Sequence, residues 1–184
     1  MILYRCFAWR ADAAPADRDG PLWFPREFQG DGRHDNPEHY GCLYLAGEAA
    51  SSVVEQLARF RSQRLVAGLL RRRGLPLGLA ELELGDDAEL IDLDDPRVLR
   101  RARLRPSQVA TRRRGVTQPQ ARRLHEVHAG AAGLRWWSTF EALWINVTVF
   151  DRAARLLSVR GVRALSADDP VVGEAAQFLG MRVG

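Results

Sequence analysis

The stretch Gly32–Glu55, GRHDNPEHYGCLYLAGEAASSVVE, decides the fold. Residues 35–37, Asp-Asn-Pro, predict a turn, because proline fixes its own φ and disfavours the helical region in the residue before it. Residues 41–46 form a short apolar run that predicts a buried strand. Ser51 or Ser52 is then expected to cap a following helix. The stretch therefore predicts a turn, a strand and the first turns of a helix.

Three polar side chains fall around this predicted strand-to-helix junction: Arg33, Tyr44 and Glu55. A guanidinium group pairs with phosphate oxygens through parallel hydrogen bonds, and a carboxylate or phenol can bind hydroxyl groups. The junction therefore suits a ligand that carries both phosphates and hydroxyls.

Composition indicates one globular domain over residues 1–184, with 46% hydrophobic and 27% charged residues. No apolar run approaches the roughly 18 residues of a membrane span, and the first residues do not resemble a signal peptide. Two cysteines, Cys6 and Cys42, do not make a disulfide framework, so we expect a reduced, cytoplasmic setting. The four histidines follow no recognisable metal-ligand spacing, and we expect no metal site.

All 27 basic residues are arginines, which excludes a lysine Schiff base and a P-loop lysine. The net charge of +4 favours anionic ligands and permits nucleic-acid binding. The arginine runs at residues 71–73 and 112–114 are interpreted as solvated surface.

Two further polar residues are open to two interpretations each. Arg5 lies inside an apolar run over residues 2–9 that predicts a strand; it either pairs with a nearby carboxylate or faces a ligand. Ser138 follows two tryptophans and precedes a predicted strand at residues 142–150. It is either a turn or capping residue, or a hydroxyl beside a tryptophan wall.

Four other elements are predicted from periodicity and capping residues. Residues 77–93 predict a hairpin-like pair of strands, and residues 118–131 a helix. Residues 156–162 predict a strand, and residues 169–179 a closing helix with Pro170 in its first turn.

The pattern of Gly-Arg, turn, LYLA and Glu in the opening stretch resembles the RES domain, a bacterial family of NAD-degrading toxins. Leu3-Tyr4-Arg5 and Arg135-Trp136-Trp137-Ser138 fit the same family. The resemblance implies an α+β fold: a single domain with ADP-ribosyltransferase-like mixed sheets flanked by helices. Many members carry tryptophan after the equivalent of Arg33, where this chain has His34.

The resemblance also implies roles for five residues in binding and cleaving NAD. Arg5 and Arg33 would bind phosphate groups, and Glu55 would engage the nicotinamide ribose. Tyr44 and Ser138 would line the nicotinamide end. The implied catalytic residues are Glu55, Arg33 and Ser138.

Cleavage of the nicotinamide–ribose bond passes through an oxocarbenium-like sugar, which a carboxylate bonded to a ribose hydroxyl would stabilise. The resemblance implies a toxin of the NAD phosphorylase or NAD glycohydrolase type, with NAD and inorganic phosphate as substrates and without a separate cofactor. The products would be nicotinamide and ADP-ribose 1″-phosphate. It further implies a partner antitoxin with a helix-turn-helix domain, and contact with nucleic acid only through that antitoxin. It implies no membrane partner.

Two alternatives remain open from the sequence. The acceptor of the ADP-ribosyl group could be a protein instead of phosphate, which would make the chain an ADP-ribosyltransferase. From another class, the chain could be an arginine-rich nucleic-acid-binding module, although its aromatic residues are not interleaved with arginines as stacking platforms.

Overall fold

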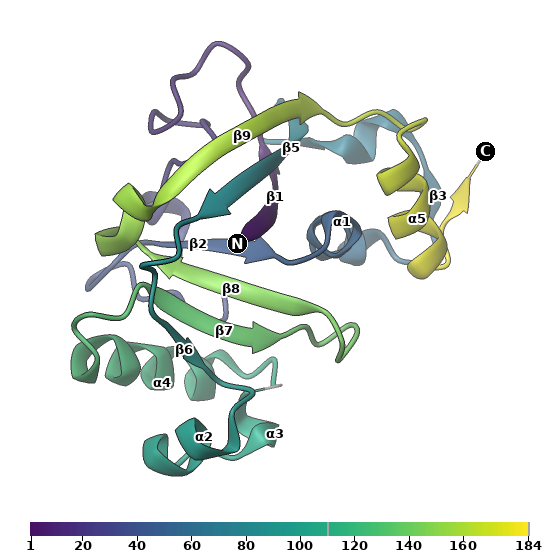
Figure 1. Ribbon diagram of the computed structural model, residues 1–184. Coiled ribbons are helices and arrows are strands. Elements are labelled where there is room, and N and C mark those ends of the chain that lie inside the picture. The colour runs from purple at the N-terminus through teal and green to yellow at the C-terminus, as the bar shows by residue number, and fades with distance from the viewer. Residues whose placement is uncertain (110, 184) are drawn as a thin grey trace. The chain divides into compact units, whose positions relative to one another are not determined.

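The chain forms mixed sheets flanked by helices in the computed structural model, which describes residues 1–109 and 111–183 (Figure 1). This confirms the predicted α+β class. The chain divides into two compact units. The first unit comprises Met1–Trp23, Ala46–Glu83 and the chain from Ser158, and the second comprises Phe24–Leu45 and Leu84–Leu157. The single domain over residues 1–184 stays a prediction.

The first unit is built on β1, which pairs antiparallel with β5 from Ile2–Glu83 to Ala8–Leu77. β9 and β4 also pair with β5, and helices α1 and α5 pack together. The elements are β1 (Ile2–Ala8), α1 (Ala49–Leu57), η2 (Ala58–Phe60), β3 (Arg64–Leu65), η3 (Ala67–Leu70), β4 (Arg71–Arg72), β5 (Leu75–Leu84), β9 (Leu157–Ala164), α5 (Pro170–Phe178) and β10 (Arg182–Val183).

The second unit contains a parallel pair, β6 with β7, and an antiparallel pair, β7 with β8. Helix α4 lies along these strands in Figure 1, and its residues Ala121 and Leu124 join a core with Leu134 and Phe150. The elements are η1 (Arg26–Phe28), β2 (Cys42–Ala46), β6 (Leu90–Asp92), α2 (Pro96–Ala102), α3 (Pro106–Val109), α4 (Arg114–Val127), β7 (Gly133–Trp137), β8 (Ile145–Phe150) and η4 (Asp151–Leu156).

The predicted hairpin over residues 77–93 is wrong. β5 pairs with β1 and β9, whereas β6 pairs with β7, which lies about forty residues further along the chain. Alternation of apolar residues indicates a strand but does not identify its partner, because every half-buried strand alternates alike.

The predicted serine cap of α1 is also wrong, because the N-cap is Glu48 and both serines lie inside the helix and are buried. The helix predicted over residues 118–131 is α4, which begins earlier, at Arg114, ends at Val127 and contains Pro119. The closing helix is confirmed as α5, where the Asp169 carboxylate accepts a hydrogen bond from the Val171 backbone N–H at 3.1 Å.

Within the described residues, none of the helices is both long and apolar enough to cross a membrane.

Candidate functional site

The loop before β2 is folded around the carboxylate of Asp35, which is 5% exposed. Its Oδ2 accepts hydrogen bonds from the backbone N–H groups of Gly30 and Gly32 at 2.8 and 2.6 Å. The turn predicted at Asn36-Pro37 is present, since the Asn36 carbonyl accepts from the backbone N–H of Tyr40 at 3.0 Å. Asp35 is therefore the centre of the loop that carries Arg33 into place.

Gly32 has to be a glycine because other groups occupy the space of a side chain. A Cβ atom there would lie 2.4 Å from Asp35 Oδ1 and 2.5 Å from the Tyr44 hydroxyl. The backbone at residue 32 thus approaches the two polar groups more closely than any side chain allows.

The Tyr44 hydroxyl joins this loop to strand β2. It donates to Asp35 Oδ1 at 2.6 Å and accepts from the His34 backbone N–H at 2.8 Å. Burial raises the pKa of Tyr44 well above its ordinary value, and nearby Cys42 and Asp35 add to the shift. Tyr44 is therefore a neutral phenol whose proton is held by Asp35.

Arg33 is buried, with 7% of its surface exposed. Its Nη1 donates to the carbonyls of Val109, at 2.8 Å, and Thr111, and its guanidinium lies over the Trp136 ring at 4.7 Å from the centroid. The Thr117 hydroxyl donates to the Arg33 carbonyl at 2.6 Å. Arg33 therefore links the loop to the segment around α3 and to the start of α4.

His34 packs edge-on against Trp136, with ring centroids 5.2 Å apart and an interplanar angle of 81°. Its Nδ1 lies 2.8 Å from Thr148 Oγ1, which also accepts from Trp136 Nε1 at 3.0 Å. Burial lowers the pKa of His34 to about 3, and the positive charges of Arg33 and Arg114 contribute. The imidazole is neutral at physiological pH and does not supply a proton as an acid.

Ser138 follows directly after β7 and is 2% exposed. Its Oγ accepts from the Phe140 backbone N–H at 3.1 Å, and its own backbone N–H donates to the Trp144 carbonyl at 2.8 Å. The first interaction is the one expected of a turn residue. Ser138 also lies two positions after Trp136, the ring that Arg33 and His34 contact.

Arg5 belongs to the first unit and is buried in it. Its Nη1 donates to the carbonyls of Gly20, at 3.3 Å, and Pro21, at 2.5 Å, and its Nη2 to that of Trp23 at 3.1 Å. Burial, with a contribution from the positive charge of Arg73 and against the opposing charge of Asp19, lowers the pKa of Arg5 to about 9. The arginine thus binds loop carbonyls, whereas the sequence had suggested a carboxylate or a ligand.

Glu55 also belongs to the first unit, on α1. Its neighbours Val53, Val54 and Leu57 are fully buried, whereas Glu55 is exposed. The buried face holds the helix in place, so the carboxylate is presented from a rigid element.

The second unit brings together Arg33 and Tyr44 from the predicted set, through the network of Asp35 and His34. Sequence reasoning missed Asp35 and Thr148 as parts of this network, and it placed Trp136 beside Ser138 without its contacts to Arg33 and His34. For Asp35 a signal existed: an aspartate in a predicted turn commonly accepts hydrogen bonds from nearby backbone N–H groups. Thr148 gave none, because its partner His34 is 114 positions away.

Among the described residues, no group of three or more His, Cys, Asp or Glu side chains is placed to hold a metal ion. The second-unit site offers a buried guanidinium, an indole wall, a phenol and a neutral imidazole. Their polar contacts described above are to one another, to Asp35 and Thr148, and to the backbone.

The fold and these residues define an α+β protein with an arginine–aromatic site. The family model of the RES domain matches residues 7–169, and the protein belongs to the RES domain family. No curated protein matches the sequence. The structure is similar to a chain of a crystal structure of the M. tuberculosis MbcT–MbcA toxin–antitoxin complex, with a TM-score of 0.62 and 18% identity. That likeness covers 98% of this chain and 88% of the other, and it establishes the fold.

Proposed function

We propose that this protein is a toxin-type enzyme that cleaves NAD at the nicotinamide–ribose bond. Inorganic phosphate is the proposed acceptor. The bond from the ribose C1″ to the nicotinamide nitrogen breaks, and its electron pair neutralises the pyridinium ring. A phosphate oxygen bonds to C1″, which gives nicotinamide and ADP-ribose 1″-phosphate.

Membership of the RES domain family carries this proposal, since the resemblance in the sequence implies NAD as substrate. The second-unit site contains the types of group that such a ligand needs, a guanidinium and an indole, and in this structure the two are stacked on each other with Arg33 Nη1 bound to backbone carbonyls. The similar crystal structure is that of a toxin–antitoxin complex. An antitoxin with a helix-turn-helix domain is accordingly the partner we propose, in the cytoplasm.

The residue roles are part of the proposal. Arg33 and Arg5 bind phosphate groups, Glu55 stabilises the oxocarbenium-like ribose, and Tyr44 and Ser138 line the nicotinamide end. Arg5 and Glu55 are included on the resemblance of the sequence alone.

The neutral state of His34 agrees with this chemistry. Nicotinamide leaves from a cationic ring and needs no proton, so a site without a general acid is sufficient. The lowered pKa of His34 removes the nearest candidate acid in the second-unit site.

The test is chromatography with mass detection of NAD incubated with the purified protein, with and without inorganic phosphate. We expect nicotinamide release that rises with phosphate and a product heavier than ADP-ribose by one phosphate. Release independent of phosphate would identify water or a protein as acceptor and contradict phosphorolysis. Intact NAD after incubation with folded protein would contradict the enzyme assignment.

Glu55→Gln is the sharpest variant, because Glu55 lies on an exposed helix face and its amide has the same shape. We expect NAD turnover to fall by at least about a hundredfold, as when a transition-state charge partner is lost. Glu48→Gln on the N-cap of the same helix is the matched control and should leave turnover unchanged. Equal turnover in wild type and Glu55→Gln would remove Glu55 from the mechanism.

A further inference from the structure

A second candidate site is a pocket in the second unit, with a volume of about 820 Å³. It is open on one side and lined by β6, α2, the end of α4 and residues 128–131, and its lining residues are distinct from Arg33, Tyr44 and Ser138. This volume lies within the range of pockets that hold ligands or the anchoring side chains of a partner.

The floor of the pocket is apolar. Ile91, Leu124 and Ala131 are buried in its base, and Val98 is half-buried. Val127, the last residue of α4, also lines the pocket and has 70% of its surface exposed. Covering these side chains would remove apolar surface from water, which favours an apolar group in the pocket.

The rim carries three arginines and three acidic side chains, the latter being Glu89, Asp92 and Asp95. Arg101, Arg103 and Arg123 line the pocket, and Arg123 Nη2 donates to the Ala102 carbonyl, which fixes its guanidinium beside the end of α2. Arg101 and Arg103 are exposed at the end of α2, where their guanidinium groups can pair with an incoming carboxylate.

Two of the acidic lining residues are already engaged. Asp92 binds Arg135 at 2.8 Å, and the Asp95 carboxylate accepts from the Arg97 backbone N–H at 2.7 Å as the cap of α2. Their hydrogen-bonding capacity is partly used by the fold, whereas the third acidic lining residue, Glu89, is exposed. The arginine-rich surface around and beyond the pocket therefore decides the charge of a ligand.

Arg103 adopts the left-handed conformation, with φ of 53°, at the C-cap of α2. This position ordinarily favours glycine, because a Cβ costs about 1 kcal/mol or more there. The pocket rim therefore carries an arginine where the backbone alone would favour a residue without a side chain.

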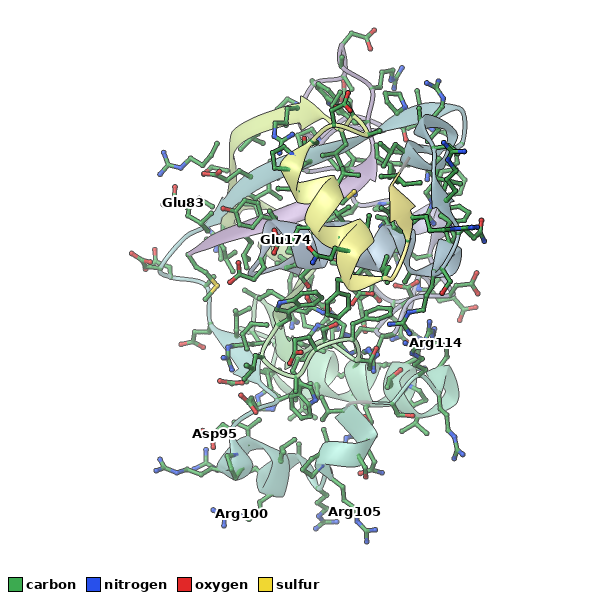
Figure 2. The ribbon with its side chains drawn as sticks, turned by 90° about the vertical axis from the view of Figure 1, so that its right-hand side faces the viewer. Glu83, Asp95, Arg100, Arg105, Arg114 and Glu174 are labelled. Atoms are coloured by element: carbon green, nitrogen blue, oxygen red, sulfur yellow. The ribbon has the colours of Figure 1, made fainter. Side chains whose placement is uncertain are left out.

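The charge of this surface extends well beyond the pocket. Residues 96–125 contain ten arginines and no Asp or Glu, whereas the other 154 residues contain 17 arginines against 23 acidic residues. Figure 2 shows Arg100 and Arg105 projecting outwards at the end of the unit that carries α2 and α3. An area of this extent exceeds what a small anion requires.

The same region lacks the features of a single-strand nucleic-acid site. The residues that line the pocket include no Phe, Tyr or Trp, so a base would find there only the His128 ring on which to stack. The apolar floor would also remain uncovered by a phosphate backbone. An acidic protein segment with aliphatic side chains could cover the apolar floor and pair its carboxylates with the arginines at the rim.

We propose that this pocket binds an acidic, amphipathic segment of a partner protein. An aliphatic side chain of the segment enters the apolar floor, and its carboxylates pair with Arg101 and Arg103. The proposal does not rest on NAD cleavage, and the binding experiment below does not involve NAD.

The probe is a fluorescent ten-residue peptide with two central leucines flanked by eight Asp and Glu residues, measured by anisotropy with the full chain. We expect binding that weakens about tenfold when both leucines are replaced by serine, because the apolar contact is lost. Replacing the acidic residues by their amides should also abolish measurable binding.

Two variants of the protein test whether the peptide binds in the pocket. Arg103→Gly and Val127→Asp should each weaken binding about three- to fivefold, a typical loss for a partly exposed contact. Arg155→Ala removes the same charge from an exposed position outside the pocket and should leave binding unchanged. Because Arg103→Gly relieves the backbone, weaker binding by that variant cannot be attributed to unfolding.

Three results would overturn the proposal. The first is equal binding of the leucine and serine peptides, which would mean attraction by charge alone. The second is tighter binding of a thymidine decanucleotide with the same sensitivity to Arg103→Gly, which would identify a nucleic-acid surface. The third is no binding of the acidic peptide at low salt.

Discussion

The loop before β2 and the surface of α2 to α4 are both rich in polar residues, yet they use arginine in opposite ways. In the loop, Arg33 is buried, bound to backbone carbonyls and stacked on Trp136. Around the pocket, Arg101 and Arg103 are exposed at the end of a short helix. The same type of side chain is buried and bound to backbone carbonyls in one place and exposed to solvent in the other. The difference arises from desolvation, because a buried guanidinium requires acceptors within the fold.

Among single substitutions compared at neutral pH, the largest effect should come from the tightest part of the loop. Gly32→Ala places a methyl group 2.4 Å from Asp35 Oδ1, so we expect about 3 kcal/mol of destabilisation as the loop and Tyr44 shift apart. Chemical denaturation would measure it. The matched control is Gly115→Ala in α4, where the new Cβ meets nothing within 4 Å and should stabilise the helix by up to about 1 kcal/mol. Equal stability of the two variants would show that the loop is not packed as described.

Asp35→Asn tests whether the carboxylate organises the loop. If the amide nitrogen takes the place of Oδ2, it cannot accept the hydrogen bonds from the Gly30 and Gly32 N–H groups. If it takes the place of Oδ1, it cannot accept the hydrogen bond from the Tyr44 hydroxyl. We expect a loss of about 2 kcal/mol in the free energy of unfolding, typical of a buried group left unsatisfied. Asp31→Asn on the exposed part of the same loop should change stability by less than about 0.5 kcal/mol. A wild-type denaturation midpoint for Asp35→Asn would contradict its role.

His34 should make the buried network sensitive to acid. Its pKa is about 3 in the folded protein and near 6.5 when unfolded, so the unfolded state binds an extra proton between these values. Stability from this residue is complete above about pH 6.5 and falls by up to about 1.4 kcal/mol per pH unit as the pH drops towards 3.

The measurement is denaturation of wild type and His34→Phe between about pH 7 and 4, the range in which the unfolded imidazole takes up its proton. The variant should lack this part of the pH dependence, whereas His39→Phe, at an exposed position, should retain it. Parallel pH profiles for wild type and His34→Phe would mean that His34 titrates normally.

The smallest effect should come from the pocket rim. Arg103→Gly removes the strain of the left-handed conformation and should raise the free energy of unfolding by about 0.5–1 kcal/mol. Arg101→Gly, two positions earlier inside α2, should instead lower it by up to about 1 kcal/mol. Thermal unfolding of both variants would measure this, and a stability loss in Arg103→Gly would show that its side chain supports the fold.

Local elements were predicted well where a few neighbouring residues decide them. The apolar run at residues 2–9 is β1, the turn at Asn36-Pro37 is present, and Asp169 with Pro170 begins α5. The pairing of β5 and β6 was not predicted, because strand partners depend on which distant segments share a core. Of the site residues, the sequence marked Arg33 and Tyr44, and their association in the second unit follows from the short stretch of chain between them.

The sequence by itself therefore determined the α+β class, the family and the types of side chain available for an anionic, aromatic ligand. Only the tertiary structure decided which arginines are buried and what they bind. Arg33 meets Val109 and Thr111, and His34 meets Thr148, across separations of 76 to 114 residues. Such contacts form because burial removes each polar group from water and requires a partner, and local sequence does not specify where that partner lies.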